Sequence, residues 1–528
     1  MTVAALGITD GSPLTRLRLT WRTALAVVSG VLLALAFPPV GASLLAPPAV
    51  ALFVLATYGT TAWRGALIGA IQGAVSFAIL LRWMSVVGSD AWLLLVGLCA
   101  FWIAIVGAGQ ALVTRLRWWP LWVACVWVLQ EALRDRIPLG GFPWGRLAFA
   151  QTATTLTPWA AVAGAPAVTF ATALAGAVLA FIALVVAARR TSWRAWAAAG
   201  AGGLVIIALA GLLVPRPIQG QGEGGPATAV AAVVQGGVPS TGLTVADERR
   251  EVFERHLAQT LRLAQDVASG TVPQPDVVIW PENAVDIDPY VDRTVADEIS
   301  AAARAVAAPI LVGAIIDAPG DPSRIANVGI VWDPQSGPGE LYLKRHPVPF
   351  GEYIPFRSLV APLVGRLDRV PRDMAPGQEA GVLQAGSVRL GDVICFEVAY
   401  DEVVHDAVTA GGRVLVVQTN NATFAGLGQP EQQIAMSRLR AVEHGRAVLV
   451  AATSGISAVI APDGAVVSEI DEANVGYLID TVPLRDTLTL ADRLGQIPEW
   501  LLAALGLGAM AWAAVRRRAV GRAAPADA

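Results

Sequence analysis

The chain has 528 residues, of which 55% are hydrophobic and only 15% are charged. Soluble globular domains carry about 25% charged residues, so this composition excludes an ordinary soluble enzyme, and the high apolar fraction excludes a disordered chain. Three cysteines are too few for a disulfide-stapled scaffold. The 38 basic residues comprise 37 arginines and a single lysine, Lys344.

The charges divide the sequence into three parts. Residues 1–214 contain 4 acidic residues and 13 arginines, residues 215–498 contain 35 acidic and 21 basic residues, and residues 499–528 contain 2 acidic residues and 4 arginines. Proline and glycine at 215–227 indicate a linker. We therefore expect a membrane domain, this linker, an acidic domain at 228–498 and a return to the membrane. Nucleic acid is excluded as a partner, because its binding requires clustered basic residues.

Long runs without charged side chains predict eight transmembrane helices. The run at 23–63 is broken by Pro38-Pro39 and is long enough for two crossings at about 20 residues each. Backbone groups inside lipid must be hydrogen-bonded internally, so such segments are expected to be helical. The remaining candidate helices lie at 65–81, 91–114, 118–130, 159–188, 195–214 and 500–515.

The placement of arginines predicts the orientation of these helices. With a cytoplasmic N-terminus, the inner loops and the basic C-terminal tail carry thirteen arginines, and the outer loops carry Arg82, Arg134, Arg136 and Arg146. Because seven helices precede it, the acidic domain is then expected on the extracytoplasmic side. The sequence thus predicts a multi-pass protein of the cytoplasmic (inner) membrane.

Strand-like and helix-like patterns alternate in the acidic domain and predict an α/β fold. Segments 326–332 and 340–343 are typical of a hairpin. Strands are predicted at 229–234, 277–280, 310–312, 393–396, 414–418, 448–452 and 457–461, and helices at 247–268, 294–306 and 431–444.

The first chemistry-bearing motif is Trp280-Pro281-Glu282-Asn283. Proline ends the apolar strand before it, which places Glu282 just beyond a strand end, where α/β sheets present functional groups. The alternative is an ordinary turn carboxylate.

The second motif contains Lys344 and continues to Glu352. A compact ammonium group stabilises a buried oxyanion in a way that a planar guanidinium does not reproduce, which would explain one lysine in an arginine-rich chain. The alternative is a solvated charge at a strand end. Glu352 either supports this site or pairs with a neighbouring arginine.

The third motif is Gly391-Asp392-Val393-Ile394-Cys395-Phe396-Glu397. Cys395 is the one cysteine outside the predicted membrane helices, since Cys99 and Cys125 lie in hydrophobic runs. A lone thiol in an exterior domain indicates a nucleophile or an intermolecular bridge, and the alternative is a structural buried thiol. A Cys-His pair would require one of the four histidines to fold beside it. These histidines have no metal-ligand spacing, so we expect no metal.

Glu282, Lys344 and Cys395, in this order, resemble the Glu-Lys-Cys triad of the nitrilase superfamily. With the membrane helices before and after the domain, the chain resembles the apolipoprotein N-acyltransferase family. The similarity extends to residues 141–145, 234–236, 344–355, 419–422 and 436–443. The chain differs from that family's pattern at Thr423-Phe424, where Trp-Phe is usual, and at Phe396, where Tyr is common.

The resemblance implies an α-β-β-α sandwich and a ping-pong acyl transfer without a cofactor. Cys395, deprotonated by Glu282, would take an acyl chain from a membrane phospholipid as a thioester, and Lys344 would stabilise the oxyanion. The α-amino group of the diacylglyceryl-cysteine of an apolipoprotein would then receive the chain. Glu352 and Glu397 would be supporting carboxylates, and a polyprenol-phosphate mannosyltransferase would be a partner.

The segment 354–370 is unusually apolar for an exterior loop. We expect it to form a lid that enters the outer leaflet, and the alternative is packing into the domain core. Phe356 and Leu363 of this segment, together with Asn420, are the candidate substrate-binding residues. Two other functions stay open, a membrane-tethered nitrilase-type amidase and a non-enzymatic scaffold.

Overall fold

The computed structural model describes residues 18–188, 192–214, 228–239, 245–360, 362, 365, 370–472 and 474–523. The chain divides into two compact units. One combines Met1–Pro215 with Leu494–Ala528, and the other is Arg216–Arg493. The predicted linker at 215–227 lies outside the described residues.

All eight apolar runs of the sequence form helices in the first unit. Prolines lie in the first turns of the second and fifth helices, where their missing N–H groups cost no intrahelical bond. The helices are α1 (Leu19–Ala36), α2 (Ala46–Thr57), α3 (Ala62–Leu80), α4 (Ser89–Val113), α5 (Trp119–Arg134), α6 (Ala160–Ala188), α7 (Trp193–Leu213) and α14 (Ile497–Ala523).

Six helices of the described residues are long and apolar enough to cross a membrane. They are α1, α3, α4, α7, α14 and the segment Thr157–Ala188 that contains α6. Helices α2 and α5 have 12 and 16 residues, fewer than the roughly 20 that a straight crossing requires. The sequence therefore identified the helical segments, and the membrane crossings of α2 and α5 stay a prediction.

Helices α3 and α4 pack with their backbones almost in contact. A Cβ atom at Gly69 would lie 2.4 Å from the carbonyl oxygen of Ile103, and one at Gly107 would lie 2.2 Å from the carbonyl oxygen of Gly65. Small residues permit such close approach of membrane helices, where van der Waals packing drives association. Glycine at these positions therefore sets the distance between the two helices.

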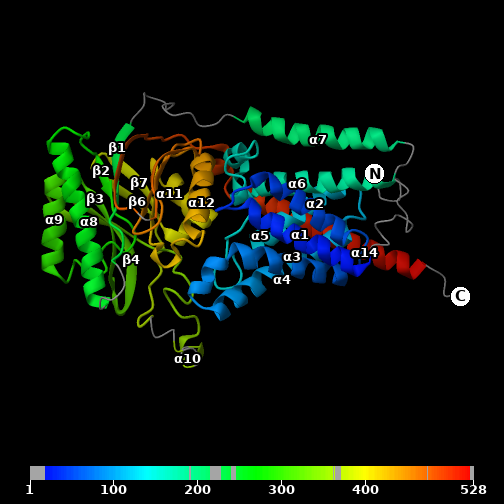
Figure 1. The fold of residues 1–528 in the computed structure, drawn as a ribbon, viewed down its shortest axis with the longest axis horizontal. Coiled ribbons are helices and arrows are strands. Elements are labelled where there is room, and N and C mark those ends of the chain that lie inside the picture. The colour runs from blue at the N-terminus through cyan, green and yellow to red at the C-terminus, as the bar shows by residue number, and fades with distance from the viewer. Residues whose placement is uncertain are drawn as a thin grey trace. The chain divides into compact units, whose positions relative to one another are not determined.

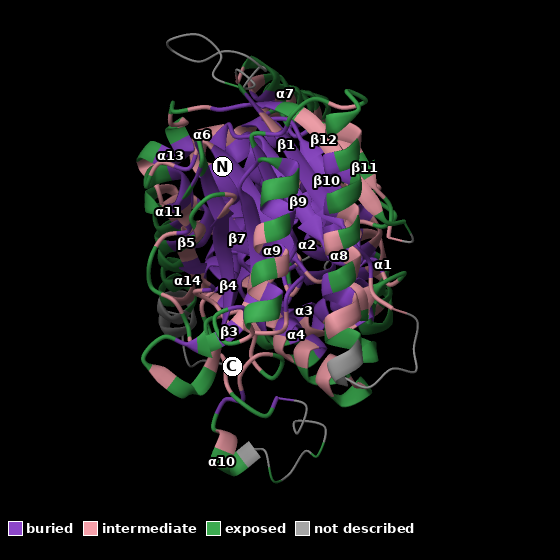
Figure 2. Cartoon of the chain, turned by 90° about the vertical axis from the view of Figure 1, so that its left-hand side faces the viewer, coloured by how far each residue is buried: buried purple, intermediate pink, exposed green. Residues whose placement is uncertain are grey.

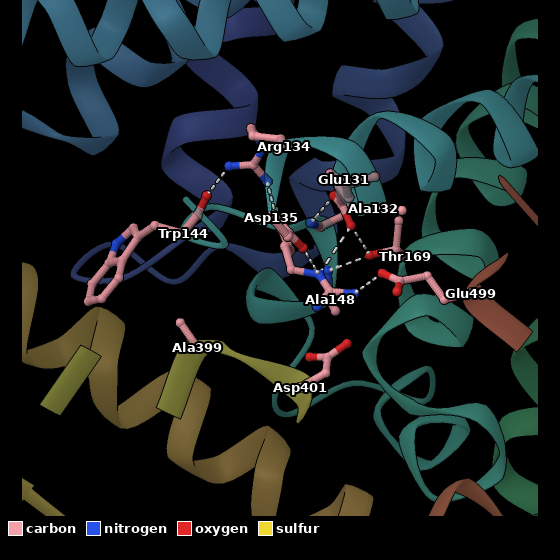
Figure 3. A network of polar contacts seen from close by, with 12 residues as sticks. Glu131, Ala132, Arg134, Asp135, Trp144, Ala148, Thr169, Ala399, Asp401 and Glu499 are labelled. Carbon is pink, nitrogen blue, oxygen red and sulfur yellow. Dashed lines mark hydrogen bonds and ion pairs between the residues drawn. The ribbon is translucent and has the colours of Figure 1, made fainter. Parts of the chain in front are cut away.

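A buried cluster of charges joins α5, α6 and α14 (Figure 3). Glu131 accepts a hydrogen bond from the Thr169 hydroxyl at 2.7 Å. The Arg146 guanidinium lies 3.3 Å from Asp135, 3.5 Å from Glu131 and 3.7 Å from Glu499. Buried charges are stable only when they are paired, so this cluster connects the consecutive helices α5 and α6 to α14, which is distant in the sequence.

The second unit contains two six-stranded sheets. The first has the order β12-β1-β2-β3-β4-β5, and the second has the order β11-β10-β9-β8-β7-β6. Strands β1, β2 and β3 run parallel, as do β7, β8 and β9. The strands are β1 (Thr228–Gln235), β2 (Val277–Ile279), β3 (Ile310–Ala318), β4 (Asp321–Asp333), β5 (Gly337–Leu343), β6 (Val382–Ala385), β7 (Val388–Ile394), β8 (Val414–Thr419), β9 (Val448–Ala452), β10 (Ser457–Ile460), β11 (Val466–Ile470) and β12 (Gly476–Pro483).

Helices cover the outer faces of both sheets and give the predicted α-β-β-α layers (Figure 1). Helices α8 (Val245–Ala268) and α9 (Arg293–Val306) lie on the first sheet, and α11 (Asp401–Thr409) and α12 (Gln429–His444) lie on the second. Figure 2 shows the buried strands behind the exposed outer faces of α8 and α9. The layer between the sheets is apolar and includes Val233, Ile279, Leu311, Leu390, Val416 and Leu449.

Several element boundaries differ from the sequence prediction. Strand β7 ends at Ile394, so the predicted strand at 393–396 was too long, and Cys395 begins a 3-10 turn, η7 (Cys395–Ala399). The predicted hairpin is confirmed as the antiparallel pair β4–β5. The sequence prediction missed β6, β11, β12, α11 and the short helices α10 (Arg357–Val360) and α13 (Leu490–Leu494).

Candidate active site

Glu282 lies in the loop that follows β2, directly after Pro281. Its buried carboxylate accepts hydrogen bonds at Oε1 from Lys344 Nζ at 3.0 Å and from Asn327 Nδ2 at 2.8 Å. Its Oε2 accepts one from the backbone N–H of Asn420 at 2.8 Å. The prediction that Glu282 stands at a strand end is confirmed, and the carboxylate is fixed at both oxygens rather than solvated.

Lys344 follows the last residue of β5 and is fully buried. Its Nζ also donates to Glu352 Oε1 at 2.7 Å, and Glu352 Oε2 accepts from the backbone N–H of Val348 at 2.7 Å. Burial by itself would lower the pKa of Lys344, but the carboxylates of Glu282 and Glu352 hold that pKa well above its usual range. The lysine therefore stays charged, and Glu352 pairs with it rather than with an arginine.

Cys395 has a backbone φ of 57°, the left-handed region that side chains other than glycine rarely adopt. Cys395 begins the turn that follows β7, and such backbone strain is typical of functional positions. Burial raises the pKa of the Cys395 thiol to about 12, and Glu282 adds to this, whereas Lys344 and Thr419 oppose it. The thiol is therefore protonated at neutral pH and needs a base before it can attack.

Glu397 connects the segment that carries Lys344 to the segment that carries Cys395. It is fully buried, and its carboxylate accepts from the backbone N–H groups of Ile394 at 2.8 Å, Arg345 at 2.6 Å and His346 at 3.0 Å. The Tyr342 hydroxyl donates to it at 2.9 Å. With both oxygens occupied by these donors, Glu397 fixes the two loops relative to each other.

The two sheets thus contribute to one site. The first sheet supplies Glu282 and Lys344, and the second supplies Cys395 and the backbone of Asn420. The carboxyl ends of parallel strands meet at one edge of a sheet, which brings segments that are distant in the sequence together. A buried base, a buried ammonium and a thiol are the groups that nucleophilic acyl chemistry requires.

The histidines do not form a Cys-His pair with Cys395. The sulfur lies 3.3 Å from the Thr419 hydroxyl, and the histidines have other partners. Among the described residues, no group of three His, Cys, Asp or Glu side chains is arranged to hold a metal. The histidine contacts are His256 with the Val252 carbonyl, His346 stacked on Tyr400, His405 with the Asp492 carbonyl and His444 with the Asp492 carboxylate.

The candidate substrate-binding residues have different surroundings. Phe356 is 74% exposed and Leu359 is 69% exposed, so these two side chains do not pack into the domain core. Leu363 lies outside the described residues. The Asn420 side chain accepts from the backbone N–H of Ala422 at 3.2 Å, and its backbone N–H holds Glu282. Asn420 therefore has a direct structural part in the site.

Two family models cover most of the chain. The apolipoprotein N-acyltransferase N-terminal domain matches residues 29–178, and carbon-nitrogen hydrolase matches residues 230–491. An apolipoprotein N-acyltransferase of Mycolicibacterium smegmatis is 39% identical over 92% of this chain and 84% of its own length. The chain belongs to the apolipoprotein N-acyltransferase family. A second apolipoprotein N-acyltransferase, from Geobacter metallireducens, is 28% identical over 94% of this chain and 96% of its own length.

The second unit is also similar to solved structures. An amidase from Nesterenkonia sp. matches 51% of this chain and 94% of its own, with 16% sequence identity and a TM-score of 0.35. The carbon-nitrogen hydrolase match at residues 230–491 covers the unit that contains the two sheets.

Within the region matched by the N-terminal domain model, Arg134 fixes the motif at residues 141–145. The buried guanidinium donates to the carbonyl oxygens of Phe142, at 3.1 Å, and Trp144 (Figure 3). The Trp144 ring packs against Trp83, with 5.4 Å between the ring centroids. Buried side-chain donors therefore hold this loop in one conformation.

Sequence reasoning missed Asn327, which holds both Glu282 and Glu352. Its Nδ2 lies 2.8 Å from Glu282 Oε1 and 3.2 Å from Glu352 Oε1. A signal was available, because Asn327 interrupts the apolar run of β4 and is buried there. A buried amide in a strand needs polar partners, and this requirement points toward a site. The contact between Thr419 and Cys395 was also missed.

Proposed function

We propose that this apolipoprotein N-acyltransferase family member moves an acyl chain from a membrane phospholipid to the α-amino group of an apolipoprotein's diacylglyceryl-cysteine. The chain would be carried as a thioester on Cys395. The observation that carries this proposal is the buried Glu282–Lys344–Glu352 arrangement around a protonated thiol, in a chain with several membrane-spanning helices.

In the first half-reaction, Glu282 takes the proton of the Cys395 thiol, and the thiolate attacks the sn-1 ester carbonyl carbon of the phospholipid. Lys344 stabilises the negative oxygen of the tetrahedral intermediate, since its ammonium is fixed before the reaction starts. The ester C–O bond then breaks, Glu282 returns the proton to the departing oxygen, and a lysophospholipid leaves. The acyl group remains on sulfur.

In the second half-reaction, the free amine of the diacylglyceryl-cysteine attacks the thioester carbonyl. Glu282 takes the proton of the attacking amine, and Lys344 again stabilises the oxyanion. The C–S bond breaks and the thiolate recovers the proton from Glu282. Glu352 keeps Lys344 in place throughout, because its Oε1 accepts a second hydrogen bond from the ammonium.

A lipid substrate fits the exposed apolar side chains better than a small amide. Phe356 and Leu359 follow Glu352 in the chain and are largely exposed. Exposed large apolar side chains close to a site mark contacts with lipid or protein. This observation favours acyl transfer over the membrane-tethered amidase, and it supports Phe356 as a lipid contact.

The arginine distribution supports an extracytoplasmic catalytic domain in the cytoplasmic membrane. Thirteen arginines fall in the loops and tail assigned to the inner side and four in the outer loops. The eight crossings, this orientation and a polyprenol-phosphate mannosyltransferase partner stay predictions. Labelling of cysteines introduced into single loops by a membrane-impermeant reagent would test the orientation.

The acyl-enzyme is the most direct test of the proposed function. Incubation of the purified protein with phospholipid should add the mass of one acyl chain to the intact protein, on Cys395 and labile to hydroxylamine. Cys395→Ala should lose this adduct because it lacks the nucleophile. Glu282→Gln and Lys344→Arg should reduce its formation by at least about 100-fold, since glutamine cannot act as a general base and a planar guanidinium does not reproduce the compact ammonium.

The chain offers a matched control for the sulfur. Cys125→Ala removes a buried cysteine of α5 and should leave the adduct intact. Addition of a diacylglyceryl lipopeptide should discharge the adduct and give an N-acylated peptide. Absence of the adduct during turnover, or hydrolysis of a small amide without transfer to the lipopeptide, would contradict the proposal.

A further inference from the structure

Thr419 is the residue whose hydroxyl contacts the reacting sulfur. It is the last residue of β8, which runs parallel to β7, and Ile394 pairs with Gln418 in the register of the two strands. The residues that come next, Cys395 and Thr419, therefore lie side by side. Thr419 is fully buried, and its Oγ1 lies 3.3 Å from Cys395 Sγ.

The Thr419 hydroxyl has one hydrogen and three acceptors within reach. Besides the sulfur, these are Asn421 Oδ1 at 2.8 Å and Gln433 Oε1 at 3.0 Å. Asn421 Nδ2 donates to the same Gln433 oxygen at 2.8 Å, which keeps the two amides together. A hydroxyl hydrogen rotates to the best acceptor available. While Cys395 is a thiol, the amide oxygens are better acceptors than sulfur, so the hydrogen points to them.

Deprotonation of Cys395 reverses this preference. A negatively charged sulfur is a stronger acceptor than a neutral amide, because charge-assisted hydrogen bonds are about twice as strong as neutral ones. The β-branched threonine has a restricted χ1 angle, so its oxygen stays beside the sulfur while only the hydrogen turns. The thiolate thus gains a donor without any movement of heavy atoms.

We propose that Thr419 is a fourth catalytic group, whose hydroxyl turns from the Asn421–Gln433 pair to Cys395 Sγ when the thiolate forms. The thiol proton goes to Glu282, and the Thr419 hydrogen remains bonded to its own oxygen throughout. The same contact stabilises the thiolate when it leaves the thioester. This inference rests on the proposed role of Cys395 as the nucleophile.

The surroundings of Cys395 explain why a second stabilising group is useful. Lys344 is the nearby cation, but Glu282 and Glu352 both bind its ammonium, so much of its charge is already balanced. Burial raises the pKa of the thiol to about 12, and Lys344 and Thr419 are the two groups that oppose this rise. A neutral donor that turns to the sulfur when the thiolate forms complements an ammonium that two carboxylates share.

Alkylation of Cys395 by iodoacetamide tests this inference without any lipid. The rate constant at a fixed pH near 8 reports the thiolate fraction, and mass spectrometry of the Cys395 peptide separates it from Cys99 and Cys125. Thr419→Val keeps the branched shape and removes the hydroxyl, whereas Thr419→Ser keeps the hydroxyl and removes the methyl group. Loss of a hydrogen bond to a charged sulfur should slow alkylation of the Val variant about 10- to 100-fold, and the Ser variant should stay close to wild type.

The comparison separates a role of the hydroxyl from a role of side-chain shape. If Thr419→Val does not fold, Thr419→Ala takes its place against Thr419→Ser, since these two variants differ by the hydroxyl oxygen alone. Equal rates in all variants, or a Ser variant as slow as the Val or Ala variant, would overturn the inference. Because no acyl donor is present, the result is independent of whether the lipid reaction proposed above is correct.

Discussion

Two buried carboxylates beside Cys395 have different partners and therefore different tasks. Glu397 accepts from three backbone N–H groups and the Tyr342 hydroxyl, so its oxygens serve as fixed acceptors for the polypeptide. Glu282 accepts from two side chains and one backbone N–H group. Side-chain donors are easier to rearrange than a backbone, so the hydrogen-bond partners of Glu282 can change more readily than those of Glu397. This contrast supports Glu282 as the proposed base and Glu397 as an anchor of the two loops.

Asp392, three residues before Cys395, is a buried acid between the two sheets. A Cβ atom at Gly329 of β4 would lie 2.3 Å from Asp392 Oδ2 and 2.7 Å from Gln418 Oε1, which shows how close these groups come. Among the described residues, Gln418 Oε1 has no hydrogen-bond donor, and the Asp392 carboxyl group interacts with the backbone N–H of Val393. Burial, together with the charge of Glu397, holds the pKa of Asp392 well above its usual range. A protonated Asp392 would supply the missing donor to Gln418.

A protonated Asp392 in the folded protein predicts that the free energy of unfolding depends on pH. A carboxyl whose pKa is raised by folding stabilises the protein fully below the pKa of the unfolded chain, about 3.9, and loses this contribution as the pH rises through the raised value. Asp392→Asn should remove this decrease in stability at high pH, because the asparagine amide donates to Gln418 at every pH. On the alkaline side, the free energy of unfolding of the variant should exceed that of wild type by about 1–3 kcal/mol. Unfolding temperatures in detergent should diverge as the pH increases, and parallel curves would contradict the prediction.

Sequence reasoning located most of the charged site residues but not their neutral partners. Glu282, Lys344 and Cys395 belong to motifs with a known order, and the rarity of lysine drew attention to Lys344. Asn327 and Thr419 gain their importance from contacts across strands, and such contacts are not encoded in local spacing. A polar residue in an apolar strand was a usable signal for Asn327. No comparable signal identified which hydroxyl would meet the sulfur.

At the scale of elements, α3 and α4 depend on glycine for their separation. Gly69→Leu would place a side chain where the Ile103 carbonyl oxygen now lies 2.4 Å from the Cβ position. We expect destabilisation by about 1–3 kcal/mol, because overpacking forces the two backbones apart. The measurement is the unfolding temperature of the purified protein in detergent.

Gly97 provides the matched control on α4. A Cβ atom there meets nothing within 4 Å, so Gly97→Leu gives the same gain in helix propensity without a clash. The control should be as stable as wild type or slightly more stable. Equal unfolding temperatures for the two leucine variants would show that glycine does not set the distance between α3 and α4.

The sequence predicted the helices of the membrane unit more completely than the strands of the catalytic unit. A long apolar run is a local signal for a helix, and all eight such runs are helical, including the shorter ones that form α2 and α5. Strands β6, β11 and β12 were missed because their stability comes from partners elsewhere in the chain. For β12, the partner is β1, at the opposite end of the domain's sequence.

At the scale of the whole molecule, one compact unit is assembled from both ends of the chain. Helix α14 belongs to the same unit as α1 to α7, although the catalytic unit separates them in the sequence. Glu499 at the start of α14 pairs with Arg136 at 2.6 Å, and the Arg136 guanidinium also lies over the Trp500 ring. Ion pairs with little exposure thus fix the last helix to the end of α5.

A double-mutant cycle would measure this connection. Glu499→Gln should destabilise the protein by about 1–3 kcal/mol, because it removes the carboxylate that pairs with Arg136 and with the buried Arg146. Arg136→Gln should cost less in the Glu499→Gln protein than in wild type, with a coupling energy above about 1 kcal/mol. Arg194→Gln, on α7, is the control and should be additive with Glu499→Gln. Additive effects of the Arg136 and Glu499 substitutions would refute the connection.

The pairing of β1 with β12 has a consequence for the order of biosynthesis. Thr228 pairs with Pro483 and Gln235 with Gly476, so the second edge of β1 is covered only by the last strand of the domain to be made. While the ribosome is still translating the middle of the domain, β1 presents a row of unpaired backbone groups, which is a template for aggregation. The first sheet is complete only after β12 has been synthesised, shortly before α14. Chains that terminate prematurely before β12 would therefore leave this edge open and become substrates for chaperones and proteases.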